Sequence, residues 1–178
     1  MAHYIPELDT NLTPKYIAHL REEFNDALIS LQLPKDPSYL YEPLSYVFSG
    51  KGKRLRPILL CIAGRAMGAS EDDLKYAGVA VELLHNFTLV HDDIMDQDDF
   101  RHGKYTIHKK WDESTAILTG DGIYVLSLSL IAKVKIQPLR VVKTFNEAAL
   151  MVCEGQAYDK QYENEKNISM DDYLIMVE

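Results

Sequence analysis

The sequence predicts an all-α protein, and three observations support this fold class. Apolar residues recur at spacings of three and four over most of the chain, and the alternation typical of strands is never sustained. Only seven Pro and nine Gly interrupt the 178 residues. A chain of this length buries a substantial core, so we expect a single domain over residues 1–178.

The first three expected helices are marked by apolar spacing and by the residues at their ends. A helix over residues 16–31 carries an apolar stripe and is closed by Leu33-Pro34. A short helix follows over residues 42–48. The third helix covers residues 56–67, with Pro57 in its first turn and Gly68 at its end, the positions that these residues favour.

The remaining helices are expected over residues 72 to about 96, 115–131, 138 to about 164, and from Ser169 onward. Ser70 and Asp73 resemble a capping box for the first of these helices. The last helix has a similar capping pair, Ser169 and Asp172, and reaches the end of the chain at Glu178 without Gly, Pro or a basic turn. We therefore expect the chain to be part of a longer protein.

Composition excludes several classes of protein. The chain is 47% hydrophobic with 26% charged residues, which argues against disorder, and its net charge of -8 argues against nucleic-acid binding. The two cysteines, Cys61 and Cys153, lie far apart, so they support neither a disulfide framework nor a zinc knuckle. Neither a signal peptide nor an uncharged apolar span of about 20 residues is present. We expect a cytoplasmic protein with no transmembrane segment.

The strongest chemical signal is an acidic segment, His91-Asp92-Asp93-Ile94-Met95-Asp96-Gln97-Asp98-Asp99. Asp92 and Asp96 fall on one helix face, where their like charges repel after a largely apolar stretch, so a cation should compensate them. The alternative is a solvated acidic helix end, which should not follow a largely buried segment. Mg²⁺ held by one or two carboxylates and phosphate oxygens fits these ligands better than a calcium cage.

A basic segment, Gly50-Lys51-Gly52-Lys53-Arg54-Leu55-Arg56-Pro57, places four cations at a glycine-rich turn. Glycine allows close approach of the backbone, and Lys and Arg bind phosphate. The alternative is a solvated loop, and the pattern is not a P-loop. A second basic group, Arg101-His102-Gly103-Lys104, follows the acidic helix closely enough to fold back beside its carboxylates. Together these segments predict a site for an anion bridged by metal.

The motifs and their order resemble the trans-isoprenyl diphosphate synthase family, which includes farnesyl and geranylgeranyl diphosphate synthases. Four motifs carry the resemblance: Gly52-Lys53-Arg54-Leu55-Arg56-Pro57, Asp92-Asp93-Ile94-Met95-Asp96, Arg101-His102-Gly103 with Thr106-Ile107-His108, and Gly155-Gln156-Ala157-Tyr158-Asp159. The resemblance implies an antiparallel helical bundle around a central cavity, and a homodimer. It also implies a Mg²⁺-dependent prenyltransferase of isoprenoid biosynthesis that joins isopentenyl diphosphate to an allylic diphosphate (dimethylallyl, geranyl or farnesyl).

The resemblance also implies roles for residues in the acidic segment and just after it. Asp92 and Asp96 would hold Mg²⁺ against the allylic diphosphate, and Asp93 would support them. Arg101 would contact the same diphosphate. No protein nucleophile is needed, because the double bond of isopentenyl diphosphate attacks the allylic cation and a proton is lost to diphosphate.

Further residues are implied to bind substrate. Lys53, Arg56 and His85 would bind isopentenyl diphosphate, while Gln156 and Asp159 would line the allylic side of the cavity. The resemblance places Phe87 on the cavity wall, where its bulk would limit the product to about C15 to C20. The alternative for Phe87 is simple core packing. His85 and His108 are more typical of buried histidines than of zinc ligands, and phosphate binding by them depends on the resemblance.

Two departures from the family pattern affect the predicted function. His102 stands where the family has a second arginine that contacts isopentenyl diphosphate, and a neutral imidazole does not replace a permanent bidentate cation. The second aspartate-rich motif and the lysine that follows the helix starting near Ser169 are absent from these 178 residues, so we expect the chain alone to be inactive. Two alternatives stay open: a terpene cyclase, and a non-catalytic subunit of a prenyltransferase heteromer.

Overall fold

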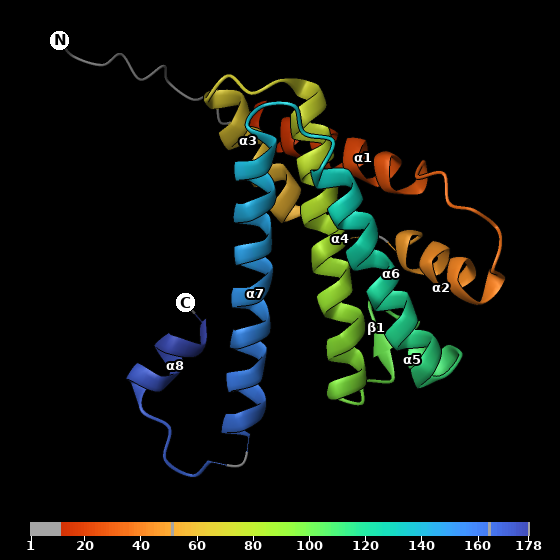
Figure 1. Cartoon of the computed structure of the whole chain (residues 1–178), viewed down its shortest axis with the longest axis vertical. Coiled ribbons are helices and arrows are strands. Elements are labelled where there is room, and N and C mark those ends of the chain that lie inside the picture. The colour runs from red at the N-terminus through yellow and green to blue at the C-terminus, as the bar shows by residue number, and fades with distance from the viewer. Residues whose placement is uncertain (1–11, 51, 164, 178) are drawn as a thin grey trace. The chain divides into compact units, whose positions relative to one another are not determined.

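The computed structural model describes residues 12–50, 52–163 and 165–177 and confirms the all-α fold class. The predictions for Lys51, for a helix end near Asn164 and for the chain end at Glu178 lie outside these residues. The elements, shown in Figure 1, are α1 (Leu12–Ile29), α2 (Ser38–Phe48), α3 (Leu55–Ala66), α4 (Glu71–Met95), β1 (Phe100–Arg101), β2 (Lys104–Tyr105), α5 (Ile107–Lys110), α6 (Glu113–Ile131), α7 (Pro138–Tyr162) and α8 (Met170–Val177).

The chain divides into two compact units, the first ending at Val134 and the second beginning at Lys135. The first contains α1 to α6 with the hairpin β1–β2, and the second contains α7 and α8. In the second unit the predicted capping pair is confirmed: the Asp172 N–H donates to Ser169 Oγ (3.1 Å), and the Ser169 N–H donates to Asp172 Oδ2 (2.9 Å). The single-domain interpretation of residues 1–178 stays a prediction.

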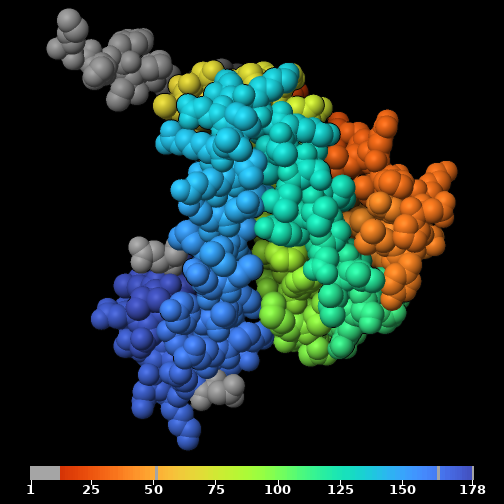
Figure 2. Space-filling model, viewed as in Figure 1, coloured from red at the N-terminus to blue at the C-terminus, as the bar shows by residue number. Residues whose placement is uncertain are grey.

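Helix α4 is the centre of the first unit and packs mainly against α6 and α3, while α2 packs on α6. Figure 1 shows α6 running alongside α4, and in Figure 2 their surfaces lie directly against each other. Two glycines allow this close packing. A Cβ on Gly120 would lie 2.2 Å from Nε2 of His91, and a Cβ on Gly78 would lie 2.6 Å from the Phe24 ring. Any larger residue there would push α6 or α1 away from α4.

Most predicted helix ends fall within a few residues of those observed, but two starts were wrong. Helix α1 already includes Leu12, and α2 begins at Ser38 with Pro43 inside it. Pro43 lacks the N–H that an interior helix position donates, so an interior proline is an uncommon feature of a helix. Here Pro43 is buried in the core. The capping of α4 was predicted correctly, since the Asp73 N–H donates to Ser70 Oγ at 3.2 Å.

The hairpin β1–β2 and the short helix α5 were not predicted. Each strand has two residues, too few to produce a visible alternation of apolar and polar side chains. The turn joining them consists of His102 (φ 51°) and Gly103 (φ 78°), and two positive φ values are typical of a tight hairpin turn. Thr106 Oγ1 then donates to the Asp98 carbonyl at 2.7 Å, which fixes the hairpin against the end of α4.

Helix α6 is long and apolar enough to cross a membrane by length and composition alone. It is also the helix that packs most closely on α4, and buried core helices pass the same test. Its buried residues include Ala116, Thr119 and Ile123. We therefore interpret α6 as a core helix of the first unit.

Candidate active site

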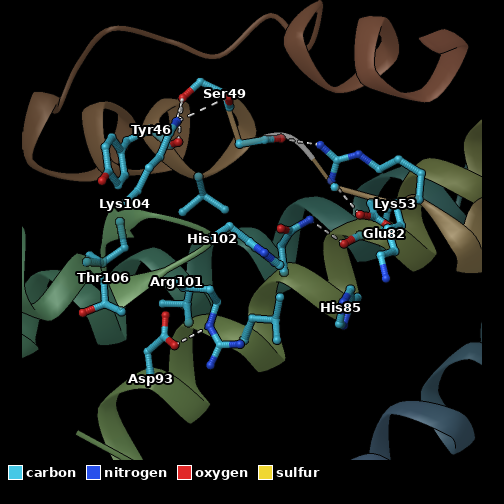
Figure 3. Close-up of a pocket in the computed structure, with 18 of the residues that line it drawn as sticks. Tyr46, Ser49, Lys53, Glu82, His85, Asp93, Arg101, His102, Lys104 and Thr106 are labelled. Atoms are coloured by element: carbon cyan, nitrogen blue, oxygen red, sulfur yellow. Dashed lines mark hydrogen bonds and ion pairs between the residues drawn. The ribbon is translucent and has the colours of Figure 1, made fainter. Parts of the chain in front are cut away.

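A cavity of about 600 Å³ lies in the first unit, between the segment that joins α2 to α3, one face of α4, and the hairpin. Figure 3 shows this cavity, which we call the basic pocket. It brings together residues from both predicted basic segments and from the acidic segment. Its charged and titratable lining residues are Lys53, Arg54, Arg56, Glu82, His85, Asp93, Arg101, His102 and Lys104.

The basic pocket carries positive charge in a protein that is negative overall. Five permanent cations and two carboxylates line it among the described residues, an excess of three positive charges, whereas the whole chain has a net charge of -8. Such a local concentration of cations attracts an anion with several negative charges. The pocket is therefore suited to a phosphate or diphosphate group.

Arg54 builds the pocket rather than offering its charge to a ligand. Its guanidinium is buried and bonds to Glu82 Oε1 at 2.7 Å, to Asn25 Oδ1 at 2.9 Å and to the Gly50 carbonyl. These bonds connect the segment before α3 to both α1 and α4. A Cβ on Gly52 would lie 3.0 Å from Arg54 Nη1, so glycine leaves room for the guanidinium. Arg54 was expected among the phosphate-binding cations of the basic segment, and its three internal partners correct that expectation.

Lys53, Arg56 and His85 lie together in the pocket, as the resemblance implied. Arg56 Nη1 is 3.3 Å from His85 Nε2, and because arginine can only donate, this nitrogen of the imidazole accepts. Burial, together with the nearby positive charges of Arg56 and Arg101, lowers the pKa of His85 to about 4. His85 is therefore a neutral ring at physiological pH, with its other nitrogen available as a donor.

Asp93 and Arg101 form an ion pair inside the basic pocket, with Asp98 as a second partner of Arg101 at 3.3 Å. Burial raises the pKa of the Asp93 carboxyl, and the Arg101 guanidinium opposes this rise by hydrogen bonding and by charge. The pair connects the end of α4 to strand β1. The position of Arg101 is thus determined by Asp93, one residue away from the predicted metal ligand Asp92.

Asp92 and Asp96 do not line the basic pocket, because Asp93 is rotated by about 100° around the helix from its neighbour Asp92. Burial and the charge of Asp96 raise the pKa of the Asp92 carboxyl. Both residues also lie at the carboxyl end of α4, where the helix dipole disfavours negative charge and the last turn contains no basic residue. A cation at this position would relieve all three effects.

The donor set at Asp92 and Asp96 fits Mg²⁺ shared with a phosphate ligand. The described residues contain no cluster of three His, Cys, Asp or Glu side chains that would hold a metal by themselves. Mg²⁺ is commonly bound through one or two carboxylates, with waters and substrate phosphates completing its six oxygens. Two carboxylates at this spacing meet that requirement without a larger set of protein ligands in the described part of the chain.

Besides Asp92 and Asp96, three further predicted site residues lie outside the basic pocket. The ring of Phe87 packs against His91 (centroids 4.7 Å apart) and Tyr124 (5.2 Å), so it contributes to the contact of α4 with α6. Gln156 and Asp159 lie on α7, in the second unit, with Gln156 half-buried and Asp159 exposed. The roles of these residues at the allylic side of a cavity stay predictions.

Tyr46, Ser49 and Lys104 line the pocket and were missed as site residues. The Lys104 ammonium is 3.2 Å from Ser49 Oγ, and Tyr46 Oη donates to the Tyr105 carbonyl at 2.9 Å. These contacts join α2 to the hairpin. Lys104 was visible in the second basic group, but nothing in the sequence pattern pairs it with α2. His108 is buried, as expected. It lies close enough to Asp93 to contribute to lowering the pKa of that carboxyl.

Comparison with known proteins assigns this fold and site to a class. The polyprenyl synthetase family matches residues 37–178. The geranylgeranyl diphosphate synthase of Methanosarcina mazei is 43% identical over 162 residues, which cover 89% of this chain and 50% of that protein. The geranylgeranyl diphosphate synthase of Sulfolobus acidocaldarius is 37% identical over 171 residues, with coverage of 91% and 50%.

A solved structure agrees with these relatives. The crystal structure of a geranylgeranyl pyrophosphate synthase superposes with a TM-score of 0.86 at 41% identity, over 90% of this chain and 50% of that one. The chain belongs to the polyprenyl synthetase family. It spans about half the length of the curated relatives it matches.

Proposed function

We propose that the chain provides the isopentenyl diphosphate pocket and the first magnesium-binding carboxylates of a trans-prenyltransferase. This enzyme would condense isopentenyl diphosphate with an allylic diphosphate such as dimethylallyl, geranyl or farnesyl diphosphate. The observation that carries the proposal is the excess of three positive charges in a pocket of a protein with a net charge of -8. The family and its synthase relatives favour this function over that of a terpene cyclase.

The basic pocket would bind the diphosphate of isopentenyl diphosphate without a metal. Lys53 and Arg56 supply charge-assisted hydrogen bonds, and the neutral ring of His85 supplies a further donor. Glu82 and Asp93 do not repel the ligand strongly, since each already forms an ion pair with an arginine. Leu89 and Val90 on the wall of the pocket offer an apolar surface to the isoprenoid chain.

Asp92 and Asp96 would act at the second diphosphate, that of the allylic substrate. When bound there, Mg²⁺ would neutralise the diphosphate leaving group and so favour formation of the allylic cation. Asp93 holds Arg101 at the boundary between the two sites, where its guanidinium would be within reach of the same leaving group. The two diphosphates would be separated because Asp93 faces the basic pocket, whereas Asp92 and Asp96 lie on another face of α4.

Calorimetry with the two substrate classes tests this assignment. Isopentenyl diphosphate should bind with similar affinity with and without Mg²⁺, whereas an unreactive allylic diphosphate analogue should bind at least tenfold more tightly when Mg²⁺ is present. Binding to the chain alone should be weaker than binding to a complete synthase. Equal Mg²⁺ dependence for both ligands would contradict the proposal, because the two sites would then not differ.

Three finer features belong to the same proposal. The enzyme would be a cytoplasmic homodimer. The carbon chain of its product would be about C15 to C20 long, with Phe87 limiting elongation. Replacing Phe87 with Ala in the complete enzyme should lengthen the product if the ring reaches the cavity wall. An unchanged product would leave Phe87 as a residue of the contact between α4 and α6, where it packs on Tyr124.

A further inference from the structure

Lys104 is a cation of the basic pocket whose surroundings differ from those of Arg54 and Arg101, which pair with carboxylates. It lies on β2, and its ammonium contacts Ser49 Oγ (3.2 Å), the Ser49 carbonyl (3.5 Å) and, at 5.1 Å, the centre of the Tyr46 ring. All three groups are neutral. Figure 3 shows Lys104 reaching Ser49 on one side of the pocket, with Lys53 and His85 on the other.

The charge of Lys104 is not compensated by any carboxylate in the described part of the chain. Arg54 is paired with Glu82, Arg101 with Asp93, and the neighbouring Lys109 with Asp99 at 2.9 Å. Among the described residues, Lys104 forms no such ion pair. A lysine held only by neutral acceptors exchanges them for an anion at little cost, because the anion offers a stronger, charge-assisted bond.

The position of Lys104 in the hairpin gives it access to the same ligand as Lys53. In the hairpin register Lys104 is paired with Arg101, so both side chains leave the same face, and Arg101 is already engaged by Asp93. Between them His102 occupies the turn, and an imidazole is not a permanent cation. Of the two basic residues in this register pair, Lys104 is therefore the one whose charge is not already paired with a carboxylate in the described part of the chain.

We propose that Lys104 is a diphosphate-binding residue of the basic pocket and acts together with Lys53 and Arg56. On binding, its ammonium leaves Ser49 and donates to a phosphate oxygen, so the hairpin and the residues around the start of α3 hold the ligand from two sides. This inference rests on the proposed function and extends it: where the turn carries His102, the adjacent strand supplies the permanent cation. The three positive charges of Lys53, Arg56 and Lys104 would then balance the negative charge of a diphosphate.

The test uses inorganic pyrophosphate titrated into the 178-residue chain in the absence of divalent cations. Lys104→Gln should weaken binding about tenfold, the loss of one charge-assisted hydrogen bond at a partly exposed site. Lys104→Arg should restore affinity to within about threefold of the original. The matched control is Lys109→Gln, which removes the same charge from a lysine outside the pocket and should change affinity by less than about twofold.

Thermal unfolding separates binding from structure, since Lys104→Gln should unfold within about 2 °C of the original chain. If Lys104→Gln does not fold, the neutral variant Lys104→Met is used for the same titration. Original affinity in Lys104→Gln, with weak binding in Lys53→Gln, would overturn this inference and leave the proposed function intact. Equal losses in Lys104→Gln and Lys109→Gln would overturn it as well. No binding of pyrophosphate to the original chain would overturn both proposals.

Discussion

The two charged regions of the first unit differ in how much of their charge is balanced within the chain. In the basic pocket both carboxylates, Glu82 and Asp93, are paired with arginines, and three cations are left over. At the end of α4 the carboxylates of Asp92 and Asp96 repel each other at the negative end of a helix dipole. One region presents positive charge directly, and the other concentrates negative charge.

This difference determines how each region can bind a diphosphate. The basic pocket can bind the anion directly, because its excess charge has the opposite sign. The carboxylates at the end of α4 would repel the same anion, so a cation must lie between them. Metal dependence is therefore the property that should distinguish two sites that bind the same chemical group.

The largest expected effect on anion binding comes from removing Lys53, just before α3, and Arg56, in the first turn of α3. The double substitution Lys53→Gln and Arg56→Gln should weaken metal-free pyrophosphate binding by at least about 100-fold, because it removes two charge-assisted contacts. Calorimetry measures this loss. The double variant Lys109→Gln and Lys110→Gln is the matched control, since both lysines lie outside the pocket lining. A loss of less than tenfold in the first variant would show that the anion binds elsewhere.

Arg54 should affect stability rather than the charge available to a ligand. Both Arg54 and Glu82 are about 5% exposed, so Arg54→Met leaves a buried carboxylate unpaired and should reduce the free energy of unfolding by about 3–5 kcal/mol. Replacing both residues, Arg54→Met with Glu82→Leu, should recover much of that loss. Denaturant unfolding of the two variants measures the difference. If the double variant were as unstable as the single one, the ion pair would not be the source of the effect.

Much of this site could be predicted from the sequence, because its motifs combine residue types with a clear chemical preference. Asp92 and Asp96 share a helix face by spacing alone, and Lys53 and Arg56 follow a glycine-rich turn. The burial of Arg54 could not be predicted, since it depends on Glu82 and Asn25, which lie 28 and 29 residues away in the chain. Lys104 was missed for a similar reason: its place in the pocket depends on a hairpin with strands of only two residues.

At the acidic end of α4, Asp92→Asn should separate metal binding from anion binding. Mg²⁺ should raise the affinity for an allylic diphosphate analogue, and in this variant that increase should be at least tenfold smaller. Metal-free binding of pyrophosphate should stay unchanged. Burial and the charge of Asp96 raise the pKa of the Asp92 carboxyl, so the neutral amide should also stabilise the metal-free protein. Asp99→Asn is the control, because Asp99 is paired with Lys109. Equal Mg²⁺ dependence in the two variants would contradict the assignment of Asp92.

The smallest expected effect is a contribution of the basic pocket to acid sensitivity. The pKa of His85 is about 4 in the folded state, below its ordinary value of 6.5, so the unfolded chain binds more protons between these two pH values. Stability from this residue is therefore present above pH 6.5 and is lost as the pH falls toward 4. In His85→Gln the side chain does not titrate, so the free energy of unfolding should fall less on acidification than in the original chain. The difference should be about 1 kcal/mol or less, because His85 is only half-buried and solvent screens its charge.

Denaturant unfolding of both proteins at pH values of about 7 and about 4.5 measures this difference, and the titrating carboxylates cancel between them. The control is His19→Gln, since His19 is an exposed residue of α1 whose partner Glu23 is also on the surface. The field that suppresses the charge of His85 is that of Arg56 and Arg101, after the larger effect of burial. Bound pyrophosphate should counter that field, so the difference between His85→Gln and the original chain should shrink when the anion is present. An unchanged difference would mean that the anion does not bind near His85.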